Sequence, residues 1–258
     1  MRNKVLELKN VTASYKEGKE HKVVLREVSF SIDEGEIVGL LGESGSGKTT
    51  LCKCILKLLK DAKGEVKHYT GNPQMIFQDP FGSLNPKKKI GWILEEPLKV
   101  GLKKYELIAD DIEGEENKEG KEDNKKPDRV DEDFKWNKQK RRKKVEEMLS
   151  LVNLPVEFYS RYPKELSGGQ RQRVSIALAL MTGTKFILAD EPLSALDVTV
   201  QAQIIELLKR LQKEKGISIL FVSHDVDVVA DLCERVLLIE EGKLREVKMN
   251  KDDEQVAE

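Results

Sequence analysis

Cysteine is scarce in this chain, which has only Cys52, Cys54 and Cys233 among 258 residues. None of the three forms a C-x-x-C pair. Cys52 and Cys54 are two positions apart in a predicted helix, where side chains do not face each other. This spacing argues against a disulfide framework or a structural metal site. We therefore expect all three to be packing residues in a reducing cytosol.

Long apolar runs and an excess of one charge are also missing. No stretch approaches the ~18 apolar residues of a membrane-spanning helix, and the first ten residues contain no apolar signal core. The 45 basic and 46 acidic side chains give a formal net charge of −1, so no nucleic-acid partner is expected. A mean hydropathy of −0.49 indicates a soluble domain. If the chain serves a membrane process, another chain must cross the bilayer.

Strand-like and helix-like segments alternate along most of the sequence. Residues 5–30 predict paired strands joined by a loop at 16–22, and residues 235–247 predict a hairpin that turns near Glu241 and Gly242. Apolar spacing predicts the remaining elements: buried strands at 37–41, 186–190 and 217–222, and helices at about 49–60, 174–181 and 200–211. This alternation indicates an α/β fold with a mainly parallel sheet, covered on both faces.

The middle of the chain has a different composition. By count, 24 of the 35 residues from 110 to 144 are charged, and the apolar residues among them show no helical or strand period. We expect a solvated, mobile insertion, because such a segment buries too little apolar area to order itself. A partner-docking role is the alternative. The tail at 248–258 is expected to be frayed.

A glycine-rich loop follows the first predicted buried strand. The run Gly42, Glu43, Ser44, Gly45, Ser46, Gly47, Lys48, Thr49 matches G-x-x-x-x-G-K-[ST] at every fixed position, and Thr50 continues into a predicted helix. Its backbone N–H groups can surround phosphate oxygens at a helix N-terminus. Lys48 is expected to neutralise β- and γ-phosphate charge, and Thr49 to offer a hydroxyl to Mg²⁺. Kinases and GTPases share this motif.

Two acidic residues stand at the end of a second buried strand. Asp190 and Glu191 end the run FILADE, and ligands of parallel sheets gather at this edge. Asp190 suits the shell of Mg²⁺, and Glu191 suits the polarisation of an attacking water. Strand-capping acids are the alternative interpretation.

A second helix cap narrows the class of protein. The run Leu166, Ser167, Gly168, Gly169, Gln170 directly precedes a predicted helix, and a serine with two glycines there forms an anion-binding cap. One nucleotide does not need two phosphate cradles in one monomer. The simplest explanation is that each chain offers this second cradle to the ATP of a partner.

With these motifs in this order, the chain resembles the ABC (ATP-binding cassette) ATPases, whose signature is LSGGQ. The resemblance runs from Leu8 to about Val247. It implies a P-loop, RecA-like core with an antiparallel β subdomain and an inserted helical subdomain. The implied segments are 1–78, 79–165 with the charged insertion at about 106–140, 166–247 and the tail 248–258. ATP and Mg²⁺ are the implied cofactors.

The resemblance also implies roles for further residues. Tyr15 corresponds to the aromatic residue that stacks on adenine, and Asp197 ends the D-loop, which crosses the dimer interface. Gln78 corresponds to the Q-loop glutamine, which senses Mg²⁺ and γ-phosphate, and His224 to the switch histidine. Glu191, His224, Lys48 and Gln78 are thus expected to be catalytic, and Thr49, Gln78 and Asp190 to serve the metal. The sequence departs from its relatives at Leu178, where arginine is common, and in the charged insertion.

Residues 75–86, 161–177 and 194–214 look like the branch of peptide and nickel importers. In that branch two ATPase chains work beneath two multi-span membrane subunits supplied by a solute-binding protein, and this chain resembles the second ATPase. We thus expect an ATPase at the cytoplasmic face of the cell membrane, paired with itself or a paralogue. Many peptide-importer relatives have a C-terminal extension that is not expected here, so nickel stays open as cargo. A soluble cassette without a membrane partner, such as those of phosphonate degradation, is the alternative function.

Overall fold

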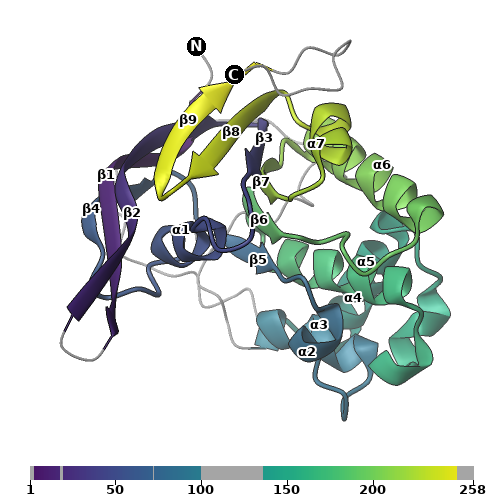
Figure 1. Ribbon diagram of the computed structural model, residues 1–258. Helices are drawn as coiled ribbons and strands as arrows, with labels where there is room; N and C mark the ends of the chain where they lie inside the picture. Colours follow the sequence, from purple (N-terminus) through teal and green to yellow (C-terminus); the bar gives the residue numbers. More distant parts are fainter. Residues whose placement is uncertain (1–2, 18–19, 72, 100–135, 249–258) are drawn as a thin grey trace, which may run out of the picture.

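The computed structural model describes residues 3–17, 20–71, 73–99 and 136–248, and its strands form two sheets (Figure 1). The smaller sheet is antiparallel, in the order β2-β1-β4. It consists of β1 (Lys4–Glu17), β2 (Glu20–Asp33) and β4 (Lys63–His68). The predicted hairpin is confirmed, but its loop is shorter than expected because the strands extend to Glu17 and resume at Glu20.

The larger sheet has the order β5-β6-β7-β3-β8-β9. Its strands are β3 (Ile37–Leu41), β5 (Gln74–Ile76), β6 (Phe186–Asp190), β7 (Ser218–Val222), β8 (Arg235–Glu240) and β9 (Lys243–Val247). All neighbours pair in parallel except β8 and β9, which form the predicted antiparallel hairpin. Every residue of β3 and β7 is buried, as expected for strands covered on both faces. The predicted mainly parallel α/β fold is therefore confirmed.

Helices cover this sheet from two sides. Near the small sheet lies α1 (Lys48–Ile55), whereas α2 to α5 gather on the other side of the parallel strands (Figure 1). These are α2 (Pro80–Ser83), α3 (Ile90–Lys99), α4 (Lys138–Leu151) and α5 (Gly168–Leu180), followed by α6 (Val198–Lys215) and α7 (Val226–Leu232). Short 3₁₀ turns occupy Val156–Ser160 and Pro163–Glu165. Two apolar cores result, one on each face of the large sheet: one is shared with α1 and the small sheet, and the other with the remaining helices.

Two sequence expectations were wrong at the ends of helices. The helix expected to reach Lys60 ends at Ile55, because Lys57 takes a positive φ of 56° and the Leu58 N–H donates to the Lys53 carbonyl. The expectation of irregular structure up to residue 144 fails from Lys138 onward, where α4 begins. Asn137 accepts a hydrogen bond from the Lys140 N–H at 2.8 Å and caps this helix. The rest of the charged insertion and the tail from 249 lie outside the described residues.

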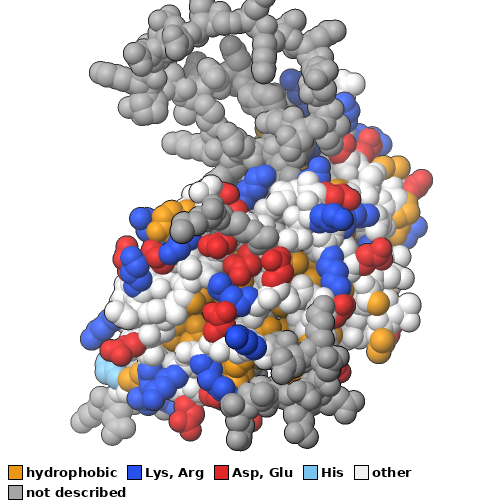
Figure 2. All heavy atoms as spheres, turned by 90° about the horizontal axis from the view of Figure 1, so that it is seen from above, with side chains coloured by type: hydrophobic (Ala, Val, Ile, Leu, Met, Phe, Trp, Pro, Cys, Tyr) orange, Lys and Arg blue, Asp and Glu red, His pale blue; other side chains and the backbone are white. Residues whose placement is uncertain are grey.

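The distribution of charge on the surface and the burial of two cysteines agree with what the composition predicts. Seen from above, acidic and basic side chains are interspersed over the described part of the surface (Figure 2). Cys52 and Cys54 are buried packing residues, as expected. Among the described helices, none combines the length and the apolar character needed to cross a bilayer.

Candidate nucleotide site

The glycine-rich loop connects the carboxyl end of β3 to the start of α1, and glycine is needed at several of its positions. Gly45 and Gly47 have φ values of 83° and 114°, in the region that side chains disfavour. A Cβ atom added at Gly42 would lie 2.6 Å from the carbonyl oxygen of Ile239 on β8. The loop is thus tightly curled, with its N–H groups next to the N-terminus of a helix, as an anion cradle requires.

Lys48 is held inside this loop and is only 7% exposed. Its Nζ donates to the carbonyl oxygens of Gly42 at 2.6 Å and Glu43 at 2.9 Å. These bonds direct the ammonium group toward the centre of the loop. The positive charge therefore stands where a phosphate group in the cradle would need it.

A cleft of about 520 Å³ opens beside the loop. It is lined by Tyr15, Lys22, Val24, Ser44, Gly45, Gly47, Lys48, Thr49, Thr50, Gln78 and Glu191. Seven of the fifteen residues predicted to bind the nucleotide thus line this cleft, together with the predicted catalytic residues Gln78 and Glu191. The Tyr15 hydroxyl lies 3.5 Å from Thr50 Oγ1. Lys22 and Val24 of β2 were not predicted, since their place depends on the cross-strand pairing of Lys22 with Tyr15.

Asp190 ends β6 opposite the start of α1. The Thr49 hydroxyl donates to Asp190 Oδ2 at 3.4 Å, which brings two of the three predicted metal residues together. Burial and the adjacent Glu191 carboxylate raise the pKa of Asp190, whereas Thr49 and Lys48 act in the opposite direction. A half-buried carboxylate beside a hydroxyl is a donor set of hard oxygen atoms, and this set fits Mg²⁺.

Glu191 is held in an unusual conformation by groups from several strands. Its φ is 45°, which is rare outside glycine, and its N–H donates to the Val222 carbonyl at 2.9 Å. Gln78 Nε2 donates to one carboxylate oxygen at 3.2 Å, and His224 Nδ1 lies 3.3 Å from the other. Three of the four predicted catalytic side chains, Glu191, Gln78 and His224, therefore converge on one point at the mouth of the cleft. Backbone strain at such a point is typical of a functional site.

The signature residues lie elsewhere. Ser167 caps α5, where its Oγ accepts from the Gln170 N–H at 3.4 Å and its own N–H donates to Gln170 Oε1 at 3.0 Å. Asp197 caps α6 by accepting from the Val200 N–H at 3.0 Å. The residues that line the cleft include neither Asp197 nor any of the four predicted signature residues, Ser167, Gly168, Gly169 and Gln170. Within one chain, the structure does not bring the second cradle to the first.

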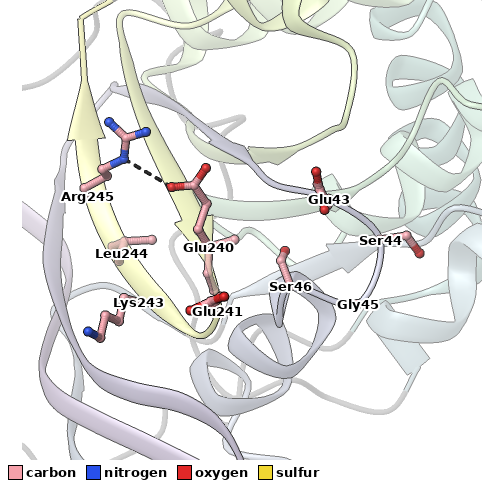
Figure 3. Close-up of a pocket in the computed structure, with 10 residues that line it drawn as sticks. Glu43, Ser44, Gly45, Ser46, Glu240, Glu241, Lys243, Leu244 and Arg245 are labelled. Atoms are coloured by element: carbon pink, nitrogen blue, oxygen red, sulfur yellow. Dashed lines mark hydrogen bonds and ion pairs between the residues drawn. The ribbon is translucent and has the colours of Figure 1, made fainter. Parts of the chain in front are cut away.

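A second hollow, of about 810 Å³, lies between the glycine-rich loop and the β8–β9 hairpin (Figure 3). Glu43, Ser44, Gly45 and Ser46 form one wall, and the β8–β9 hairpin with its Glu240–Arg245 ion pair forms the other. Of the predicted nucleotide residues, Glu43 and Ser46 line this hollow and not the cleft.

This parallel sheet, with a phosphate-binding loop after one strand and paired carboxylates after another, defines a P-loop nucleotide-binding protein. More narrowly, the chain belongs to the ABC transporter family, which matches residues 25–194.

Several relatives share most of the chain. The oligopeptide transport ATP-binding protein OppF of Streptococcus mutans is 39% identical, over 95% of this chain and 75% of that protein. AmiF of Streptococcus pneumoniae, also named as an oligopeptide transport ATP-binding protein, is 36% identical over 96% of this chain and 75% of that protein. Among solved structures, the dimeric ABC transporter cassette MJ0796 is 32% identical, with a TM-score of 0.71 over 95% of this chain and 99% of that one. The same cassette is known with ADP and Pi after hydrolysis.

Proposed function

We propose that this chain is the ATP-hydrolysing subunit of an importer of oligopeptides. The observation that carries the proposal is the convergence of Gln78 and His224 on the two carboxylate oxygens of Glu191, beside the phosphate loop. A chain that only bound nucleotide would not need this arrangement. The peptide cargo is supported by the names of OppF and AmiF, and nickel is the alternative cargo from the sequence.

Phosphoryl transfer depends mainly on positioning and on charge neutralisation. The loop N–H groups and Lys48 bind the phosphates, and the ring of Tyr15 packs on the adenine. Glu191 orients the attacking water and accepts its proton. Gln78 and His224 keep the carboxylate in place, and His224 also reaches the γ-phosphate.

A magnesium ion fits the oxygen donors at the start of α1. Thr49, Asp190 and Gln78 would hold it. When bound, the ion neutralises charge on the phosphates. The raised pKa of Asp190 is consistent with a buried carboxylate that gains from a nearby cation.

Each complete site consists of residues from two chains. Ser167 and Gly169 cap a helix outside the chain's own cleft, so they serve the ATP of a second cassette, either a copy or a paralogue. Two multi-span membrane subunits and a solute-binding protein complete the importer, with the cassettes at the cytoplasmic face of the membrane. Closure on ATP and opening after hydrolysis would drive transport as a population shift.

The substitution Glu191→Gln tests the hydrolytic part of the proposal. The amide cannot accept the proton of water, so ATP hydrolysis should fall about 100-fold or more, at about 1.4 kcal/mol for each factor of ten. Binding of a fluorescent ATP analogue should persist. Glu214→Gln is the matched control, because Glu214 is an exposed residue near the end of α6. Normal hydrolysis by Glu191→Gln would refute the role of Glu191.

Cargo is tested separately in proteoliposomes that contain the membrane subunits and the binding protein. ATP-dependent uptake of a labelled oligopeptide is expected. Uptake of nickel without uptake of peptide would leave the ATPase assignment in place but would overturn the peptide assignment.

A further inference from the structure

The segment from Glu191 to Asp197 joins the hydrolysis site to the helix α6. At its first residue is the strained Glu191, and at its last is the cap of α6, Asp197. Inside the segment, the Ser194 hydroxyl donates to the Glu191 carbonyl at 3.1 Å. Motion of this segment would therefore act directly on the backbone of Glu191.

One side chain of α6 forms two hydrogen bonds with the backbone of the segment Glu191–Asp197. Gln201 Nε2 donates to the carbonyl oxygens of Leu193 at 3.1 Å and Leu196 at 3.2 Å. Both bonds come from a single amide nitrogen, so one group fixes two points of the segment that are three residues apart. Gln201 is only partly buried and is not among the residues that line the cleft.

The same segment packs on the signature helix. A Cβ atom added at Gly168 would lie 3.2 Å from Leu196 Cδ2, and one added at Gly169 would lie 2.3 Å from Val200 Cγ1. The two glycines are thus in close contact with side chains that flank Asp197. Because the cap Ser167 is directly next to Gly168, displacement of Leu196 would shift the second phosphate cradle.

We infer that Gln201 is a positioning residue that acts on two ATP sites at once. Its amide fixes the segment Glu191–Asp197 so that Glu191 stays aligned in the chain's own cleft. By holding Leu196 on Gly168, it also aligns the cradle that this chain lends to its partner. This inference rests on the proposed sharing of sites between two cassettes.

Three substitutions at Gln201 test the donor role. Gln201→Met keeps the length and removes both hydrogen bonds, and Gln201→Glu places a carboxylate against two carbonyl oxygens. We expect turnover to fall about tenfold or more in both, since small misplacements of catalytic groups are costly. The KM for ATP should change little. Gln201→Lys retains an N–H donor and should keep most of the activity, whereas a purely structural role would not distinguish the lysine from the methionine.

Exposed Gln139 on α4 offers a matched control, because Gln139→Met makes the same chemical change elsewhere. Turnover should remain at the wild-type level. Thermal unfolding followed by circular dichroism checks that each variant is folded. If Gln201→Met turns over at the wild-type rate, the inference is overturned.

Mixed pairs of differently tagged cassettes separate the two effects of Gln201. In one pair, a Glu191→Gln chain is combined with a Gln201→Met chain, so the only active site uses the Glu191 of the altered chain. In the other pair, one chain carries both substitutions and the other chain is wild type. The only active site then combines the Glu191 of the wild-type chain with the signature residues of the Gln201→Met chain. Both pairs should be slower than the pair of Glu191→Gln with wild type. Slowing in only one pair would contradict action on two sites.

A third mixed pair tests separately whether the signature residues act across the dimer. Here Glu191→Gln and Ser167→Ala are on one chain, and slowing of the wild-type site shows that the cradle works across the dimer. No slowing here would reject the shared site of the proposed function. Slowing here, with no slowing in either Gln201 pair, would reject only the role of Gln201.

Discussion

At the scale of single residues, His68 on β4 combines burial with an incomplete set of hydrogen bonds. Its Nε2 lies 2.8 Å from the Ile55 carbonyl, which only accepts, so Nε2 bears the proton. Nδ1 is buried with no partner among the described residues. Burial lowers the pKa of His68 below its usual 6.5. The folded protein thus prefers the neutral ring, whereas the unfolded chain binds a proton more readily.

This difference predicts that stability depends on pH. The contribution of His68 is present above about pH 6.5 and is lost as pH falls from there toward the lower pKa of the folded state. Urea unfolding between pH 7.5 and 5.5 should show a smaller loss of unfolding free energy in His68→Gln than in wild type. Exposed His21 provides the control substitution. Equal losses in wild type and His68→Gln would contradict the prediction.

Residues in contiguous motifs were predictable, and residues placed by pairing were not. The phosphate loop and the pair Asp190–Glu191 follow from local patterns, because strand ends and helix starts fix where such groups point. Lys22 reaches the cleft only through its register with Tyr15, and Gln201 reaches the segment after Glu191 only because α6 folds back on it. The sequence contains no separate signal for either of these contacts.

At the scale of elements, the sequence predicted the strands better than the helix ends. Buried strands are short apolar runs, and all three were predicted within one residue. The start of α4 was missed because Lys138–Lys144 is dominated by cations, which concealed the buried residues Val145, Met148 and Leu149. Capping by Asn137 and apolar packing outweigh this run of charge.

The contact of α3 with the turn at Val156–Ser160 provides a prediction at this scale. A Cβ atom added at Gly91 would lie 2.5 Å from the ring of Tyr159. The hydroxyl of Tyr159 donates a hydrogen bond to the carboxylate of the buried Glu95 at 2.5 Å. Because that bond restrains the ring, Gly91→Ala should destabilise the fold by about 1–3 kcal/mol through overpacking. At about 2–4 °C per kcal/mol for a chain of this size, thermal unfolding should show the loss.

A double-mutant cycle with Tyr159→Ala identifies the cause. Once the ring is gone, Gly91→Ala should cost little more, so the two effects should not add. Simple additivity would mean that the alanine acts through the backbone of α3 and not through Tyr159. ATP binding should be unchanged in all variants, because neither residue lines the cleft.

At the scale of the whole molecule, the chain folds as a framework that places the two proposed phosphate cradles in different regions. Part of the glycine-rich loop lines the cleft, whereas Ser167 caps α5, and α5 lies on the helical side of the large sheet (Figure 1). Two cassettes placed head to tail would join each cradle to the complementary one of the other chain. Assembly and catalysis should then depend on each other.

This dependence predicts how the protein behaves in solution. With Glu191→Gln, ATP should be bound but not consumed, so size-exclusion chromatography should show a dimer with ATP and a monomer without it. Adding Ser167→Glu should abolish the dimer, because a carboxylate in the cap opposes the triphosphate of the partner chain. Each monomer should still bind a fluorescent ATP analogue, since its own loop and Lys48 are intact.

In wild type, activity per molecule should rise with protein concentration as dimers form. Constant activity per molecule on dilution well below the dimerisation range would mean that a single cassette hydrolyses ATP alone.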